Sequence, residues 1–314
     1  MRECLENVRK RNPLIHNITN YVTVNDVANA LLACGGSPIM AEAVEEVEEI
    51  TVGCAGLNIN IGMLNSAKAR AMELAGLQAQ REGHVILLDP VGVGAGAFRR
   101  ETVKRLMEKI QFTAIRGNIS EIRAVAELVG VLNSDAKYKG VAEVSGSDRR
   151  SNAIVEHPEG KAPESAGERN RGKNHGVDAT PEEAVTEENA ETVAEFVKKL
   201  AGRTGSIIAV TGRIDLVADE KICYRIKNGR PEMSRITGTG CQLSGMMTAF
   251  LAANPGCPLK AAAAAVCCMG LAGEKAWEHM AAGEGNASYR NRIIDAISLM
   301  EGEALEKGAQ YEIC

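Results

Sequence analysis

Apolar segments of strand length alternate with helical segments along most of the chain. Val85–Asp89 is a continuous apolar run that ends in an acid, and it follows the helical pattern of Ser66–Arg81. A strand without polar alternation is buried on both faces, which is typical of a parallel strand with helices on either side. The sequence therefore predicts an α/β fold, with a central mainly parallel sheet flanked by helices on both faces.

Other segments follow the same two patterns. The expected strands cover residues 37–40, 57–62, 112–115 and 206–212, together with a hairpin formed by 214–218 and 223–226. The expected helices cover residues 2–11, 22–33, 180–201, 243–253, 259–282 and 290–307, and one more opens at 116–121 and ends at 128. The helix of 180–201 is expected to begin in a capping box at Thr180-Pro181-Glu182-Glu183.

The segment 14–20 has no clear period. It reads Leu-Ile-His-Asn-Ile-Thr-Asn, a mixture of polar and apolar side chains that follows Asn12-Pro13. One interpretation is a loop whose Asn side chains bond their own backbone. The other is that the amides and the histidine line a pocket.

Length, composition and charge limit the function. A chain of 314 residues with 45% hydrophobic content can bury a large core, and we expect one domain over residues 1–314. The formal net charge of −5 gives no general basic field, and an aromatic content of 3% leaves few stacking platforms. Nucleic acid is therefore not an expected partner.

Cysteine usage and the N-terminus indicate the compartment. The nine cysteines are scattered, odd in number and without a pair of Cys-x-x-Cys motifs, which argues against a disulfide framework or a structural zinc site. Glu3 and Glu6 stand where a signal peptide would be hydrophobic, and the longest apolar run, 261–273, is too short to span a bilayer. We expect a cytoplasmic protein with no membrane contact.

The composition changes sharply between residues 142 and 176. Apart from alanines, the only aliphatic residues there are Val144, Ile154 and Val155, and no aromatic residue occurs. Such a segment cannot bury enough apolar surface to offset its ordering entropy. It is predicted to be a flexible surface insertion, and its His157 and His175 are not expected to bind a metal.

The stretch from Ser234 to Gly245 is expected to join a strand to a helix. Gly238 and Gly240 allow a tight turn with close backbone approach, and the amides of the following helix point at whatever lies before Gly238. The positive end of the helix dipole could hold a phosphoryl group there. Cys241 stands in the first turn, where a thiolate is favoured. The alternative is a plain glycine turn with a small buried cysteine.

Polar or adaptable side chains follow several of the expected strands. Met40, Asp89 and Thr211 stand at the ends of three strands, and Arg116-Gly-Asn-Ile-Ser-Glu121 follows a fourth. In parallel sheets, ligands bind outside the carboxyl ends of the strands. Several such ends in one chain favour a ligand site at that edge.

Six spaced motifs together carry a resemblance to a known family. They are Asn12-Pro-Leu-Ile-His-Asn-Ile-Thr-Asn20, Ser37-Pro-Ile-Met40-Ala, Leu88-Asp-Pro-Val-Gly92, Arg116-Gly-Asn-Ile-Ser-Glu121, Val210-Thr-Gly212 and Thr237-Gly-Thr-Gly-Cys241. In this order they resemble the hydroxyethylthiazole kinase family, over roughly residues 12–135 and 177–310, with the insertion outside the resemblance.

The resemblance implies a fold, a reaction and an assembly. The fold would be ribokinase-like, in a homotrimer with the thiazole pocket at the subunit interface. The reaction would be ATP-dependent phosphorylation of the primary alcohol of 4-methyl-5-(2-hydroxyethyl)thiazole, in thiamine salvage. Phosphoryl transfer spreads charge over the oxygens of the moving group, so it needs cations, amides and a metal around one point.

The resemblance also assigns site residues. Arg116 and Thr211 would contact the phosphates of ATP, and Asp89 with Glu121 would organise Mg²⁺ through water. Mg²⁺ prefers oxygen ligands and keeps several waters, which suits two carboxylates.

Substrate and catalytic roles fall on the first and last motifs. Met40, Asn20 and Gly238 are expected to contact the thiazole alcohol, and the catalytic turn would consist of Gly238, Thr239, Gly240 and Cys241. Most of the wider superfamily has an aspartate base where this family has a cysteine. It stays open whether Cys241 accepts the alcohol's proton or only positions the substrate.

Three alternative hypotheses compete with the hydroxyethylthiazole kinase interpretation. Another ribokinase-like small-molecule kinase, such as a hydroxymethylpyrimidine kinase, would share the anion turn. A cysteine acyl-transfer enzyme would use Cys241 as nucleophile, with His16, His84 or His279 as base, although no motif connects any of them to it. The third alternative is a non-catalytic thiazole- or nucleotide-binding protein.

Overall fold

The computed structural model describes residues 1–132 and 184–314. The predicted insertion at 142–176 and the predicted capping box at Thr180 lie outside the described residues.

The described strands form one sheet in the order β2-β1-β3-β4-β5-β6-β7-β8-β9. Strands β1 to β6 pair in parallel, and β6 to β9 pair antiparallel. The strands are β1 (Leu14–Ile18), β2 (Ser37–Met40), β3 (Gly56–Asn60), β4 (Val85–Asp89), β5 (Ala114–Gly117), β6 (Ile207–Val210), β7 (Asp215–Ala218), β8 (Cys223–Ile226) and β9 (Tyr311–Ile313). The predicted α/β fold with a mainly parallel sheet is confirmed.

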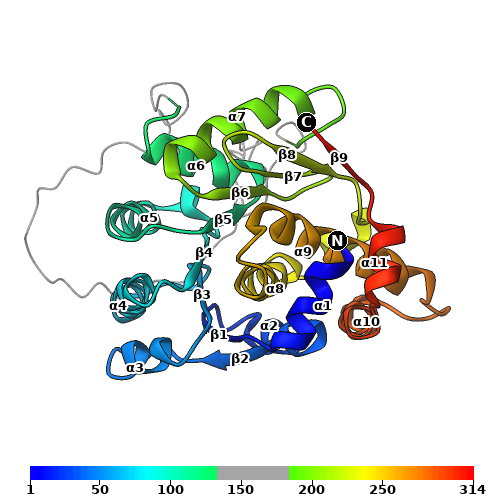
Figure 1. Cartoon of the computed structure of the whole chain (residues 1–314), viewed down its shortest axis with the longest axis horizontal. Coiled ribbons are helices and arrows are strands. Elements are labelled where there is room, and N and C mark those ends of the chain that lie inside the picture. Colours follow the sequence, from blue (N-terminus) through cyan, green and yellow to red (C-terminus); the bar gives the residue numbers. More distant parts are fainter. Residues whose placement is uncertain (133–183) are drawn as a thin grey trace, which may run out of the picture.

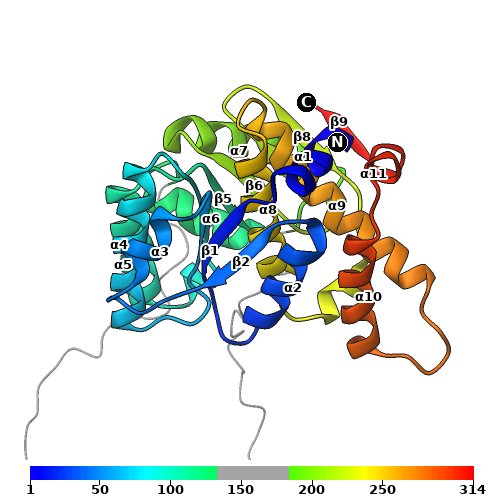
Figure 2. The same cartoon turned by 60° about the horizontal axis from the view of Figure 1, so that its bottom comes forward.

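Helices cover both faces of this sheet (Figures 1 and 2). One face carries α3 (Val47–Val52), α4 (Ser66–Arg81), α5 (Ala97–Lys109), α6 (Ile119–Leu128) and α7 (Ala190–Thr204). The other face carries α1 (Arg2–Arg11), α2 (Val24–Cys34), α8 (Thr239–Ala253), α9 (Pro258–Glu278), α10 (Asn286–Ser298) and α11 (Gly302–Gly308).

Each face of the sheet has its own apolar core. Side chains of α1, α2, α8 and α9 form one buried cluster, and side chains of α4, α5, α6 and α7 form the other. Helix α8 is buried at nearly every position from Cys241 to Leu251, because α1, α2 and α9 cover the sides that do not face the sheet. The run Ala261–Ala265 of α9 is fully buried too, and its small side chains permit close helix packing.

The segment 14–20 differs from the loop prediction. Its first five residues form β1, which lies between β2 and β3. Polar side chains are tolerated there because they are hydrogen-bonded: His16 Nδ1 lies 2.9 Å from Thr51 Oγ1, and His16 Nε2 lies 2.9 Å from the Ala41 carbonyl. His16 is therefore a structural histidine, and the idea that it lines a pocket is wrong.

Several other details differ from the sequence prediction, and helices α3 and α5 were not expected. A 3₁₀ helix, η4 (Pro231–Arg235), precedes the glycine turn in place of a strand. Helix α7 begins only at Ala190, and residues 184–189 precede it as turns. The expected helix 290–307 is two helices, α10 and α11, separated at 299–301. Strand β9 was not expected, and it pairs with β8 at the edge of the sheet.

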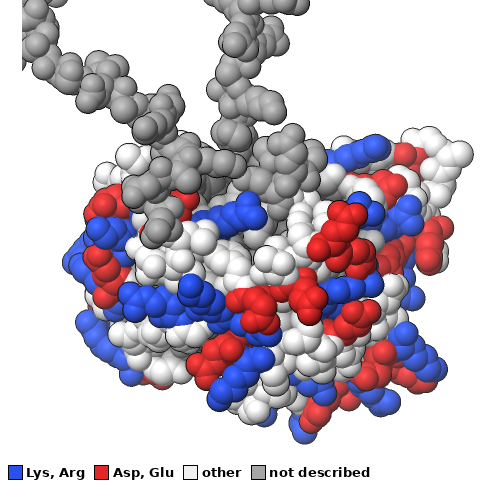
Figure 3. Space-filling model, turned by 90° about the horizontal axis from the view of Figure 1, so that it is seen from above, with Lys and Arg blue, Asp and Glu red and all other residues white. Residues whose placement is uncertain are grey.

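Charges of both signs are interspersed on the face of the molecule shown in Figure 3. This agrees with the absence of a general basic field in the composition. No helix among the described residues is long and apolar enough to cross a membrane.

Candidate active site

The carboxyl ends of the parallel strands meet at one edge of the sheet, and helix α8 begins beside them. Gly238 caps α8 with φ 91°, a conformation that favours glycine. A Cβ atom on Gly238 would lie 2.4 Å from Thr23 Cγ2, so the chain here approaches the segment after β1 too closely for any side chain. The tight turn and close approach predicted for this glycine are both present.

A guanidinium group lies against the first turn of α8. A Cβ atom on Gly240 would lie 2.5 Å from Arg116 Nη1 and 2.7 Å from Nη2. Arg116 belongs to β5, and its Nη2 donates a hydrogen bond to Thr211 Oγ1, just after β6. The Nε of Arg116 is buried without a hydrogen-bond partner. Two strand ends and the helix thus bring a cation, a hydroxyl and unpaired amides to one place.

Asp89, the last residue of β4, is fully buried beside this cation. Its Oδ2 accepts hydrogen bonds from Asn60 Nδ2 at 2.7 Å and from Ser244 Oγ at 2.8 Å. Its Oδ1 has no hydrogen-bond partner and lies 3.8 Å from Arg116 Nη1. Burial raises the pKa of Asp89, and the charge of Arg116 opposes that shift.

Glu121 opens helix α6 in a complete capping box. Its Oε2 accepts from the Asn118 backbone N–H at 2.8 Å, and the Asn118 side chain accepts from the Glu121 N–H at 2.9 Å. Its Oε1 accepts from the Gly92 N–H at 2.8 Å. Burial, followed by the nearby charge of Asp89, raises the pKa of Glu121 to about 7. A cation near these two carboxylates would relieve their repulsion.

Cys241 is buried at the start of α8, and two amides converge on its sulfur. Asn20 Nδ2 lies 3.3 Å from Sγ, and Asn60 Nδ2 lies 3.2 Å from it. Burial, followed by the charge of Asp89, raises the pKa of the Cys241 thiol. Burial thus opposes the thiolate that the helix terminus is expected to favour.

Met40 lies at the end of β2 and lines a hollow of about 200 Å³. The other residues that line this hollow are Asn17, Thr19, Tyr21, Val24, Ala41 and Glu42. Asn20 follows the lining residue Thr19 in the sequence, and the Asn20 side chain points to Cys241. Asn20 thus joins the lining of the hollow to the glycine turn, although Gly238 itself does not line the hollow.

A family model for the hydroxyethylthiazole kinase family matches residues 5–158 and 159–303. The chain belongs to the hydroxyethylthiazole kinase family. A relative named hydroxyethylthiazole kinase from Clostridium acetobutylicum is 45% identical over 312 residues, which cover 99% of each chain.

Solved structures agree with this family assignment. The structure of a hydroxyethylthiazole kinase protein from Pyrococcus horikoshii is 30% identical, covers 99% of this chain and 98% of that one, and superposes with a TM-score of 0.76. A ribokinase-like superfamily protein from Enterococcus faecalis is 13% identical, covers 99% of this chain and 95% of that one, and has a TM-score of 0.56. That second likeness shows the fold alone, which is ribokinase-like.

The match to the hydroxyethylthiazole kinase family extends further than the sequence motifs indicated. The matched residues run through 142–176, and the Clostridium acetobutylicum relative is aligned over 99% of its own length. The expectation that this segment lies outside the resemblance is therefore wrong.

Two polar residues at the site had no role in the sequence analysis. Asn60 ends β3, and Ser244 lies one turn into α8; both bond Asp89 Oδ2. Asn60 could have been noticed as a polar residue at a strand end, like Asp89. Ser244 carried no such signal, because its partner is distant in the sequence.

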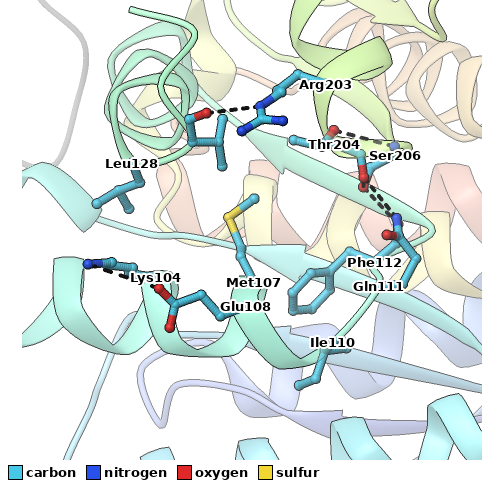
Figure 4. A pocket seen from close by; sticks show the side chains of 11 residues that line it. Lys104, Met107, Glu108, Ile110, Gln111, Phe112, Leu128, Arg203, Thr204 and Ser206 are labelled. Carbon is cyan, nitrogen blue, oxygen red and sulfur yellow. Dashed lines mark hydrogen bonds and ion pairs between the residues drawn. The ribbon is translucent and has the colours of Figure 1, made fainter. Parts of the chain in front are cut away.

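A second, larger hollow lies at the amino ends of the strands, where β5 and β6 begin (Figure 4). Its volume is about 310 Å³, and it is lined by Lys104, Met107, Glu108, Ile110, Gln111, Phe112, Leu128, Val129, Arg203, Thr204 and Ser206. None of the site residues expected from the sequence lies among them. The carboxyl edge is therefore the stronger candidate for the active site.

Proposed function

We propose that this protein transfers a phosphoryl group from ATP to the primary alcohol of 4-methyl-5-(2-hydroxyethyl)thiazole, in thiamine salvage. Membership in the hydroxyethylthiazole kinase family supports the reaction. The observation that carries the proposal for the site is the convergence of Arg116, Asp89 and the amide end of α8 at one edge of the sheet.

We assign the ATP phosphates to the space before α8. Arg116 supplies a planar cation that matches phosphate oxygens, and Thr211, bonded to it, supplies a hydroxyl. The amides of Thr239 and Gly240 belong to the first turn of α8, where backbone N–H groups have no intrahelical partner. These groups would stabilise the negative charge that develops on the phosphate oxygens during phosphoryl transfer.

The carboxylates beside this space fit Mg²⁺. Asp89 Oδ1 is buried without a hydrogen-bond partner, and burial, followed by the charge of Asp89, raises the pKa of Glu121. Mg²⁺ keeps waters and phosphate oxygens among its ligands, so two carboxylates are enough on the protein side. When bound, Mg²⁺ would neutralise charge on the phosphates.

The thiazole alcohol is assigned to the hollow of Met40. Met40 and Val24 offer apolar contacts to a thiazole ring, and a volume of about 200 Å³ suits a molecule of this size. Asn20, whose side chain contacts Cys241, and the backbone of Gly238, which packs against Thr23, are also assigned to the substrate. Cys241, whose sulfur is contacted by the amides of Asn20 and Asn60, is assigned to the reacting hydroxyl of the alcohol.

We further propose a cytoplasmic homotrimer with the thiazole site at the subunit interface. All nine cysteines are free thiols, which suits a reducing compartment. Tyr21 supports the interface: it lines the hollow of Met40, yet 58% of its surface is exposed in the single chain.

The experiment that tests the proposal is an ATP-consumption assay against two vitamin-precursor alcohols. We expect phosphate transfer to 4-methyl-5-(2-hydroxyethyl)thiazole, with the phosphorylated product identified by mass spectrometry. Faster transfer to a hydroxymethylpyrimidine would favour the other kinase. Thiazole binding without any ATP turnover would indicate a non-catalytic binding protein, and a covalent acyl adduct on Cys241 would indicate the acyl-transfer enzyme.

A further inference from the structure

We propose that Asn60 is a positioning residue, which sets the carboxylate of Asp89 and the sulfur of Cys241 relative to each other. This inference rests on the proposed kinase function. It assigns a role to a side chain that bridges the phosphate end and the alcohol end of the site.

The single amide of Asn60 contacts both groups. Its Nδ2 lies 2.7 Å from Asp89 Oδ2 and 3.2 Å from Cys241 Sγ. An amide nitrogen carries two hydrogens, so one is available for each acceptor. Strand pairing supports this geometry, because Asn60 of β3 lies directly opposite Asp89 of β4.

The oxygen of Asn60 fixes which way the amide points. Its Oδ1 accepts from the Gly62 N–H at 2.9 Å and from Asn20 Nδ2 at 3.2 Å. A flipped amide would bring its oxygen against the Asp89 carboxylate and its N–H groups against two donors. The side chain thus has one hydrogen-bonded orientation, with both hydrogens and both lone pairs used.

The hydrogen bond from Asn60 helps to fix the orientation of the Asp89 carboxylate. Its Oδ2 already accepts two hydrogen bonds, from Asn60 and Ser244, and this leaves Oδ1 toward Arg116. Without the Asn60 donor the carboxylate could rotate, and the unpartnered oxygen would no longer be held toward the phosphate site. The same change would release one of the two amides that hold Cys241 Sγ.

Asn58 offers a matched control. It is the same residue type on the same strand, two positions earlier, and therefore on the same face of the sheet. It is also fully buried, and its Nδ2 donates to Asn17 Oδ1 at 3.0 Å. In the described part of the chain it has no hydrogen bond to Asp89 or Cys241, so its loss reports on a buried strand amide outside the contact between those two groups.

The test compares Asn60→Ala, Asn60→Asp and Asn58→Ala by thermal unfolding and steady-state kinetics. Each Asn60 variant loses a hydrogen bond to a charged carboxylate. We therefore expect kcat to fall about 10- to 100-fold in both variants, while the KM for ATP changes less than about threefold. Asn60→Asp keeps the shape but places a third carboxylate beside Asp89, so it should not rescue. Asn58→Ala should lower stability with kcat nearly unchanged.

A double-mutant cycle separates positioning from a structural role. If Asn60 acts partly through the cysteine, Asn60→Ala should cost less in kcat when Cys241→Ala is already present. Additive effects, equal losses of kcat in the Asn58 and Asn60 variants, or Asn60 variants that all fail to fold would overturn the inference. A parent protein that does not phosphorylate the thiazole alcohol would overturn the proposed function instead.

Discussion

His16 shows how a polar residue can sit inside a parallel sheet without a catalytic role. Both ring nitrogens are hydrogen-bonded, to Thr51 and to Ala41, and the side chain is fully buried. Burial lowers the pKa of His16 from its ordinary value of 6.5. The unfolded chain therefore binds more protons than the folded chain in the range just below that value.

We predict that His16 makes the protein less stable at mildly acidic pH. The free energy of unfolding should fall as the pH drops below about 6.5, because the buried neutral ring must gain a proton in the unfolded state. In His16→Gln this fall should be shallower, even if the variant is less stable at pH 8. Urea unfolding from pH 5 to pH 8 measures both slopes, and equal slopes would contradict the prediction.

Substitutions at Cys241 separate a nucleophile from a positioning group. We predict that Cys241→Ala is impaired but measurable, because general-base help is worth roughly 10²–10⁴-fold and other groups supply the remaining stabilisation. Cys241→Asp should retain substantial activity, since the amides of Asn20 and Asn60 that contact the sulfur could donate to a carboxylate. Two inactive variants, together with a trappable adduct on the parent's Cys241, would establish a covalent mechanism.

At the scale of elements, the contact between α8 and β5 couples a glycine to the proposed ATP site. We predict that Gly240→Ala displaces the Arg116 guanidinium, because the new Cβ would lie 2.5 Å from Nη1. The KM for ATP should rise about tenfold or more, as in Arg116→Ala. Gly240 is not at positive φ, so no backbone strain is expected, and any loss of thermal stability would come from moving the guanidinium away from the buried Asp89.

Gly256→Ala is the control for this prediction. A Cβ atom there would meet nothing within 4 Å, and the residue follows the end of α8. An unchanged KM for ATP in Gly240→Ala would mean that ATP binding does not depend on the position of the Arg116 guanidinium against α8.

Most elements could be predicted from the sequence, and the errors have physical causes. Continuous apolar strands such as β4 and well-capped helices such as α4 were found with their observed bounds. Strand β1 was missed because His16 and Asn17 break its apolar pattern. The His16 ring is satisfied by Thr51, and Asn17 bonds both the nearby Ile15 carbonyl and the distant Asn58. Strand β9 was missed because all three of its side chains are exposed and it depends on pairing with β8.

The site was less predictable than the elements. Residues at strand ends, such as Asp89 and Arg116, could be found because parallel strands end at a common edge. Their protonation could not, since it depends on burial: the helix terminus favours a thiolate for Cys241, and burial raises the pKa of the same thiol. Contacts between separate elements, such as Ser244 to Asp89, appear only in three dimensions.

At the scale of the whole molecule, both ends of the sheet expose large apolar side chains, but they differ in their distance from the hollow of Met40. Near the β2 end, Tyr21 and Val22 are 58% and 65% exposed, and Tyr21 also lines the hollow of Met40. Near the β9 end, Ile313 is 62% exposed, far from that hollow in the strand order. Large apolar side chains at the rim of a binding site are typical of an interface.

We predict that Val22→Glu disrupts the proposed trimer and weakens thiazole binding together. Val22 is exposed in the single chain, so a glutamate there should not disturb folding, but its charge would be desolvated in an interface. Light scattering should give about three times 33.4 kDa for the parent and one chain mass for the variant. The KM for the thiazole alcohol should rise in the variant, because the partner subunit would no longer close the hollow. Ile313→Glu, the control at the opposite end of the sheet, should keep the parent's mass and KM. A parent that is monomeric, or a Val22→Glu variant that stays assembled with an unchanged KM, would show that this end of the sheet is not the interface.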